Sequence, residues 1–157
     1  NTSPTGVRGL MMLTEDTADR MGVSDRLDPK QSIPAGAKYV NLMLESIPSR
    51  IPEPDRTYMS LASYNIGYAH VEDARVLAQR LKLNPDSWAD VKKTLVMLNN
   101  PKYYVNAKYG YCGCGQPVIF VESIRSYYNI LLRNQPSYSP NNYNYKVAKA
   151  DQLEVTN

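Results

Sequence analysis

The sequence has few of the residues that usually carry nucleophilic or metal chemistry, with one histidine and two cysteines among 157 residues. The single histidine, His70, has no serine or cysteine at a recognisable spacing, so a nucleophilic triad is not supported, and we expect it at the surface or a cleft rim. Only one residue separates Cys112 from Cys114, whereas zinc-binding pairs usually have about two to four residues between them and come with a second pair. We therefore predict no metal and no cofactor. The two cysteines form either a local disulfide or two free thiols.

Long apolar runs and basic runs are also missing. No window approaches the roughly 18 consecutive apolar residues of a membrane-spanning helix, and residues 1–4 do not resemble a signal peptide. The 18 lysines and arginines against 15 acidic residues give a net charge of +3 without a basic cluster, so no nucleic-acid partner is predicted. Strand-like alternation is scarce, and the sequence therefore predicts an all-α domain.

Helical periodicity is clearest in a stripe that advances by four and three residues, which predicts a helix with this face toward the core: Ile33, Ala37, Val40, Leu44 and Ile47. The helix begins either at the cap Asp28, which leaves Pro34 inside it, or at Ser32. The proline-rich residues 47–54 are expected to form a connection.

Four further helices are expected, and a less regular segment follows the last of them. The first runs over 55–65 and ends at Gly67, the next continues to Asn84, and another, capped by Ser87, runs to Leu98. A last helix has a core stripe of Val121, Ile124, Tyr128 and Leu131. From Asn134 the composition shifts to Asn, Pro, Ser and Tyr, which predicts a domain over 1–133 and an irregular C-terminal segment or linker over 134–157.

Three short stretches place glycines and polar side chains where a helix would prefer strong helix formers. They are residues 6–14 (GVRGLMMLT), residues 62–67 (ASYNIG) and residues 125–128 (RSYY). Each also has a structural interpretation: methionines in a core, Asn65 capping its own helix, and a buried tyrosine at 128.

In this order, the stretches resemble the signature motifs of the soluble-lytic-transglycosylase superfamily, which has the goose-type lysozyme fold. Ser3 to Gly6 and Gly9-Leu10-Met11 resemble the first motif, residues 64–67 the second, and Tyr127 the late active-site tyrosine. The resemblance runs from about residue 1 to 133 and implies an all-α, lysozyme-like domain with an irregular tail. Met12 in place of glutamine, residues 13–18 and the cysteine-containing loop are most similar to one membrane-bound branch of this superfamily.

The resemblance implies cleavage of the β-1,4 bond between N-acetylmuramic acid and N-acetylglucosamine without water, which leaves 1,6-anhydromuramyl ends. The partner is then the glycan strand of peptidoglycan, in the periplasm, with association to the outer membrane through other parts of the full-length protein. The implied substrate-binding residues are Ser3, Met11, Met12, Tyr64, Asn65 and Tyr127, and Tyr127 also supports catalysis. Met12, and Ala69 where a second glycine is usual, depart from the family pattern.

This chemistry needs one carboxyl group with a raised pKa to protonate the leaving oxygen. The resemblance places that glutamate upstream of Asn1. Three glutamates of the chain are poor substitutes: Glu15 in a first helical turn, Glu72 on a solvated face, and Glu122 one position away from a family glutamate. Two other functions stay open at this point, a non-catalytic peptidoglycan-binding module and a goose-type lysozyme that hydrolyses the same bond.

Overall fold

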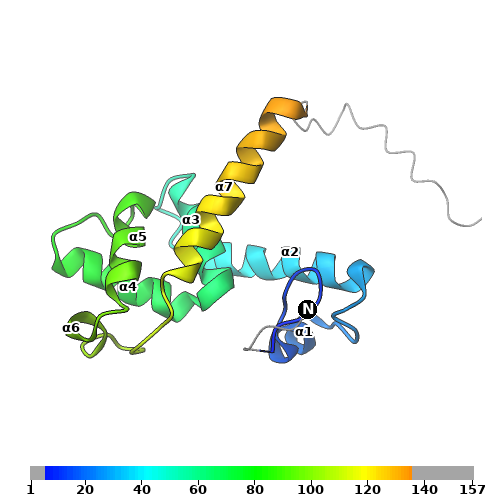
Figure 1. Cartoon of the computed structure of the whole chain (residues 1–157), viewed down its shortest axis with the longest axis horizontal. Helices are drawn as coiled ribbons and strands as arrows, with labels where there is room; N and C mark the ends of the chain where they lie inside the picture. Colours follow the sequence, from blue (N-terminus) through cyan, green and yellow to red (C-terminus); the bar gives the residue numbers. More distant parts are fainter. Residues whose placement is uncertain (1–5, 136–157) are drawn as a thin grey trace, which may run out of the picture. The chain divides into compact units, whose positions relative to one another are not determined.

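A computed structural model describes residues 6–135 and confirms the all-α prediction for this part of the chain. Its helices are α1 (Glu15–Met21), α2 (Pro29–Ser46), α3 (Asp55–Ile66), α4 (Tyr68–Arg80), α5 (Trp88–Met97), α6 (Pro101–Tyr104) and α7 (Gln116–Asn134) (Figure 1). Within residues 6–135 the one strand-like pairing is an isolated bridge between Arg8 and Leu13. The described residues up to Ser123 form one compact unit and those from Ile124 a second.

Helix α3 is the centre of the first unit, because it packs against α2, α4 and α5. The main core lies around it and also takes in the first turns of α7: Ile47, Ile51, Met59, Ala62, Val71, Ala74, Leu77, Trp88, Val91, Leu95, Leu98 and Val121. A smaller core of Leu13, Ala18, Val23 and Ala35 lies where α1 and the residues before it meet α2. The loop that carries the first motif is therefore packed on its own small core.

Helix α2 begins at Pro29, the first of the two starts that the sequence allows. The Asp28 carboxylate accepts a hydrogen bond from the Lys30 backbone N–H at 3.0 Å, and Pro34 lies inside the helix. The expected core stripe is wrong in its first half, since Ile33 is 46% exposed and Ala37 is exposed.

The buried face of α2 is made instead of small residues, Ser32, Ala35 and Gly36. These lie under the loop over residues 6–13, which approaches the helix closely. Hydrophobic periodicity does not predict such a face, because it depends on large apolar side chains. Here the helix is buried because its small residues let another segment pack closely against it.

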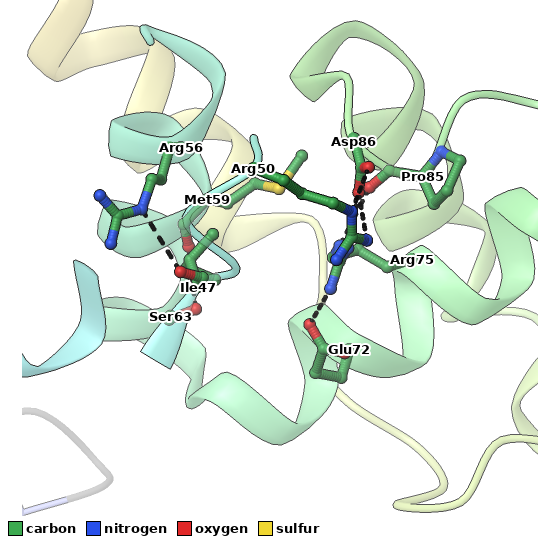
Figure 2. Close-up of polar contacts among 9 residues, drawn as sticks. All are labelled: Ile47, Arg50, Arg56, Met59, Ser63, Glu72, Arg75, Pro85 and Asp86. Carbon is green, nitrogen blue, oxygen red and sulfur yellow. Dashed lines mark hydrogen bonds and ion pairs between the residues drawn. The ribbon is translucent and has the colours of Figure 1, made fainter. Parts of the chain in front are cut away.

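Arginine side chains fix the connections between these helices. Arg56 donates to the carbonyl oxygen of Ile47 at 3.3 Å (Figure 2). It also donates to that of Leu44 at 2.8 Å, and the two bonds satisfy backbone acceptors at the end of α2. The buried Arg75 donates to Glu72, to the Pro85 carbonyl and to Asp86.

Asp86 also pairs with Arg50, whose Nε lies 3.0 Å from Oδ2 (Figure 2). Burial alone would raise the pKa of Asp86, but the hydrogen bonds from Arg75 and Arg50 hold it below its usual value. One carboxylate thus joins α4 to the connections that precede α3 and α5.

Two helix ends differ from the prediction. Helix α4 ends at Arg80 rather than continuing to Asn84, because Lys82 takes a left-handed backbone conformation with φ +59°. Ser87 precedes α5, but its side chain makes no capping bond. The carboxylate of Asp55, on α3, accepts from the Trp88 N–H at 2.6 Å instead, so tertiary structure supplies this cap.

Cys112 and Cys114 form a disulfide, with 5.1 Å between their Cα atoms. Both residues are buried, and the Cys114 N–H donates to the Asn99 side chain at 3.0 Å. Of the two alternatives that the sequence allows, the structure therefore has the disulfide, which is part of the main core.

The second unit contains the rest of α7. Tyr128 and Leu131, which the periodicity places on a core stripe, are 59% and 57% exposed, so that half of the predicted stripe is wrong. Asn134 still belongs to α7, and its side chain donates to the Ile130 carbonyl at 2.8 Å. The remainder of the predicted irregular segment, residues 136–157, lies outside the described residues, and the domain boundary after 133 stays a prediction.

Candidate functional site

The first motif forms a tight loop over residues 6–13. Arg8 and Leu13 exchange backbone hydrogen bonds of 3.1 Å, and Met12 N–H donates to the Gly9 carbonyl at 3.2 Å. Gly9 has φ +78°, and a Cβ atom there would lie 1.9 Å from the carbonyl oxygen of Arg26. The side chain of Arg26 donates to the carbonyls of Gly6 and Leu13, at 3.2 and 3.1 Å. The shape of the loop therefore depends on a glycine at position 9 and on Arg26.

The loop is also bound to α2 through Met11. Its backbone N–H donates to the Ser32 hydroxyl at 3.3 Å. Its side chain lies directly over Gly36, where a Cβ atom would come within 2.5 to 2.8 Å of three Met11 carbons. Gly36 thus provides the space that Met11 occupies, and no larger residue fits without moving the loop.

Tyr64, which lies on α3, also contacts Met11. Its hydroxyl donates to the Met11 carbonyl at 2.6 Å. Its ring lies 5.3 Å from that of Tyr39 on α2 and stacks on Phe120 of α7 with centroids 6.4 Å apart. Burial, with a smaller contribution from Tyr39, raises the pKa of Tyr64 to about 12. The phenol therefore remains a hydrogen-bond donor at neutral pH, and it holds the loop against α3.

The structure brings four of the six predicted substrate-binding residues together. Met11 and Tyr64 are in direct contact, and each has an exposed neighbour in sequence, Met12 and Asn65. Met12 has a left-handed backbone with φ +50° and is 43% exposed, so it is not a core methionine.

Asn65 does not cap its own helix, because the Gly67 N–H satisfies the Ser63 carbonyl at 2.8 Å. Its side-chain amide bonds to no other residue in the described part of the chain. Of the other two predicted site residues, Ser3 lies outside the described residues. Tyr127 is 68% exposed and belongs to the second unit, so its part in the site stays a prediction.

The three glutamates considered as substitutes for the catalytic acid are engaged elsewhere. Glu15 lies 3.9 Å from Arg26 with a side chain that is 85% exposed. Glu72 accepts from Arg75, and Glu122 accepts from the Trp88 indole at 3.2 Å and from a lysine of α5. Each of the three thus has a cationic partner within the described part of the chain.

His70 is half-buried, with its ring at the edge of Tyr109, and its Nδ1 atom has no hydrogen-bond partner among residues 6–135. The same residues contain no cluster of three or more histidine, cysteine or acidic side chains that could hold a metal ion. No helix in the described part of the chain is long and apolar enough to cross a membrane.

Comparison with known sequences identifies the fold family. A model of the transglycosylase SLT domain matches residues 1–86, a range that includes the 6–13 loop and the Tyr64-Asn65 pair. The chain belongs to this family. The match covers the part of the structure in which the 6–13 loop, α2 and α3 meet, and it therefore includes the contacts of Met11 with Ser32, Gly36 and Tyr64.

Full-length relatives carry a more specific name. A membrane-bound lytic murein transglycosylase F of Methylobacillus flagellatus is 60% identical over 148 residues, 94% of this chain and 31% of that protein. Proteins of the same name from Nitrosospira multiformis and Thiobacillus denitrificans are 54% and 55% identical over 88% of the chain, which is 29% and 30% of their lengths. They belong to the membrane-bound branch that Met12 and the cysteine-containing loop indicate. The chain spans about three-tenths of the length of these relatives.

The motifs do not include four of the residues that position this SLT loop: Arg26, Ser32, Tyr39 and Phe120. Phe120 is the only phenylalanine of the chain, which is a weak signal. Arg26, Ser32 and Tyr39 have no local signal, because their contacts join segments that are distant in sequence.

Proposed function

We propose that this chain is part of the catalytic domain of a lytic transglycosylase, which cleaves the MurNAc–GlcNAc β-1,4 bond of peptidoglycan without water and leaves 1,6-anhydromuramyl ends. The observation that carries the proposal is the contact between the first two SLT motifs, in which the Tyr64 hydroxyl holds the Met11 carbonyl. The contact places Met12 and Asn65, both exposed, on neighbouring segments. These are the side chains that we assign to sugar binding.

The proposed reaction needs one acid. A carboxyl group with a raised pKa protonates the oxygen that leaves from N-acetylmuramic acid, and the resulting carboxylate then takes the proton of the C6 hydroxyl as that oxygen attacks C1. Because the attacking oxygen belongs to the sugar, no second carboxylate has to activate water, and the usual two-carboxylate geometry of glycosidases is not required. We assign the acid to a glutamate upstream of Asn1, since Glu15, Glu72 and Glu122 are engaged elsewhere.

The remaining assignments follow from the family and its named relatives. Tyr127 and Ser3 complete the proposed sugar contacts, and peptidoglycan glycan strands are the substrate. We place the protein in the cell envelope, on the periplasmic side and associated with the outer membrane. Support comes from the names of the relatives, which describe them as membrane-bound and as acting on murein.

Product analysis tests this function. Purified peptidoglycan is digested with the gene product that contains this chain, and the muropeptides are separated by chromatography and weighed by mass spectrometry. Products with 1,6-anhydromuramyl ends are expected, and they are lighter than the hydrolysed products by the mass of one water molecule. Reducing muramic ends would instead identify a goose-type hydrolase, and the absence of both products would reject catalysis.

A second digestion tests the position of the acid. The polypeptide that begins at Asn1, verified by mass spectrometry, is expected to bind peptidoglycan without turning it over. Turnover by this polypeptide would show that a residue within the chain is the acid and would overturn the upstream assignment.

A further inference from the structure

A cavity of about 470 Å³ lies between α4 and residues 103–109, and it shares no residue with the 6–13 loop or with Tyr64 and Asn65. Its volume falls in the range of roughly 300–1,000 Å³ that is usual for small-molecule sites. Aliphatic side chains from α4 and from the end of α5 form part of its lining, namely Val76, Leu77 and Leu98. The cavity therefore offers apolar surface to a ligand of the size of a short peptide.

Two cations line this cavity without an acidic partner. Arg80 donates to the Asn106 carbonyl at 3.2 Å, and the Lys108 ammonium lies 5.1 Å from the centre of the Tyr109 ring. No acidic side chain among residues 6–135 forms an ion pair with either of them. Most of the donors of Arg80 and all three of Lys108 thus remain available to a ligand.

The acidic residues in the cavity lining are already engaged. Glu72 pairs with the buried Arg75 (Figure 2). Asp73 is buried, and its two carboxylate oxygens accept the backbone N–H groups of Lys108 and Tyr109, at 3.0 and 2.9 Å. Asp73 thereby fixes the segment that carries Lys108 against α4, so one of the two cations is held in place by the fold.

The charges of this cavity favour an anionic ligand. With Glu72 paired, Arg80 and Lys108 contribute two positive charges against the one negative charge of Asp73, an excess of one. Arginine and lysine bind carboxylates by charge-assisted hydrogen bonds, and Arg80 and Lys108 are both exposed, so that a ligand can reach them. The lining thus fits a short peptide that carries free carboxylates.

We propose that this cavity binds the stem peptide of peptidoglycan, with Arg80 and Lys108 pairing with its carboxylates, an assignment that rests on the proposed function. The muramic acids of a glycan strand carry short peptides with several carboxylates, and a strand in the Met12–Asn65 region brings such peptides to the domain. The cavity then selects strands that keep their stems, and Arg80 and Lys108 are specificity residues rather than catalytic ones.

Binding is measured by nuclear magnetic resonance on the 157-residue chain with the tripeptide L-Ala-γ-D-Glu-meso-diaminopimelate. The amide signals of Lys108 and Tyr109 are expected to shift and saturate with a Kd of about 1 mM. Arg80→Gln and Lys108→Gln should each raise that Kd about fivefold or more. Lys93→Gln is the matched control, because Lys93 is an exposed lysine paired with Asp90 on α5, away from the cavity. Absence of saturable shifts up to about 10 mM, or equal effects of the three variants, would overturn the proposal.

Two further ligands test the chemistry. The same tripeptide with amidated carboxyl groups is expected not to bind. The α-linked peptide L-Ala-L-Glu-L-Lys is expected to bind at least about fivefold more weakly. Equal binding of this ordinary peptide would show a general carboxylate site and reject the stem-peptide assignment.

Turnover separates this proposal from the proposed function. With the gene product that contains this chain, Arg80→Gln should slow the release of anhydromuramyl products from intact peptidoglycan about fivefold. It should leave unchanged the rate on glycan strands from which an amidase has removed the stems. If the unsubstituted protein releases no such product from either substrate, the proposed function fails, whereas an equal loss on both substrates rejects only the stem-peptide site.

Discussion

The Tyr64 hydroxyl donates a 2.6 Å hydrogen bond to the carbonyl of Met11, a residue 53 positions earlier in the chain. The bond joins α3 to the 6–13 loop, which Ser32 and Gly36 bind from α2. The two segments that carry the proposed sugar contacts are thus held by one tyrosine. This arrangement gives Tyr64 a positioning role that can be separated from direct contact with sugar.

Removal of this hydroxyl should affect both stability and activity. Tyr64→Phe keeps the ring contacts with Tyr39 and Phe120 but leaves the Met11 carbonyl without its donor. We expect a loss of about 1–2 kcal/mol in the free energy of unfolding, and a fall of about tenfold in kcat/KM. Urea unfolding and muropeptide release measure these. Tyr104→Phe, at a half-buried tyrosine of α6, is the matched control; an equal effect there would contradict the role of the bond.

Tyr64 also predicts a pH dependence. Its pKa in the folded chain is about 12, above the usual 10.0, because burial and the neighbouring Tyr39 disfavour the phenolate. Between these two values the unfolded chain has lost the proton and the folded chain keeps it, so stability falls as pH rises from about 10 to about 12. Unfolding in urea at about pH 9 and about pH 11 should show a smaller decline for Tyr64→Phe than for the unsubstituted chain. Parallel declines would contradict the raised pKa.

Gly36 should not tolerate a side chain. In Gly36→Ala the new Cβ atom meets the Met11 side chain at 2.5 to 2.8 Å, so we expect a loss of about 1–3 kcal/mol. Thermal unfolding measures it. Gly113→Ala is the control, since a Cβ atom there meets nothing within 4 Å. The double substitution Met11→Ala with Gly36→Ala should recover part of the loss; full additivity would show that the two residues do not interact.

The two arginines that pair with Asp86 should contribute unequally to the free energy of unfolding. Arg75 has a side chain that is 7% exposed, whereas that of Arg50 is 63% exposed. Arg75→Met leaves Glu72 and Asp86 without their buried partner and should cost about 3 kcal/mol. Arg50→Met should cost less than about 1 kcal/mol, because the surface pair is screened by water. Equal losses in urea unfolding would contradict this ranking.

The lowered pKa of Asp86 also predicts how the effect of Arg75→Met changes at acidic pH. A carboxyl whose pKa is depressed in the folded chain contributes stability above its unfolded pKa, and that contribution is lost as pH falls through the folded value. Below about pH 4, the difference between Arg75→Met and the unsubstituted chain should therefore become smaller.

Asn65→Ala tests sugar binding without a structural role. The side-chain amide of Asn65 is exposed and bonds to no other described residue, so we expect a change in unfolding free energy within about 0.5 kcal/mol. If Asn65 binds sugar, product release should fall about tenfold or more. Asn41→Ala, at an exposed residue of α2 that bonds to Glu45, is the control. Unchanged turnover in Asn65→Ala would remove this residue from the site.

Local sequence signals predict where the helices begin and end better than they predict which residues each helix buries. Asp28 before Pro29 and Gly67 after α3 mark the ends of their helices, because capping depends on a few adjacent residues. The buried face of α2 is not predicted, since Ser32, Ala35 and Gly36 are buried by what packs on them and not by their own hydrophobicity. The prediction that Ser87 caps α5 is wrong for the same reason, because the acceptor is the Asp55 carboxylate of another helix.

The sequence by itself determined the helical class, the family, and the motifs at residues 6–14 and 64–67, because each depends on the order and type of neighbouring residues. Only the tertiary structure decided that Cys112 and Cys114 are joined, that Glu72 and Glu122 are engaged in ion pairs, and that Tyr64 acts on Met11. It also placed Arg80 and Lys108 at one cavity. The physical reason is common to all of these. Burial, pairing and pKa are properties of an environment, and that environment forms only when residues distant in the chain come together.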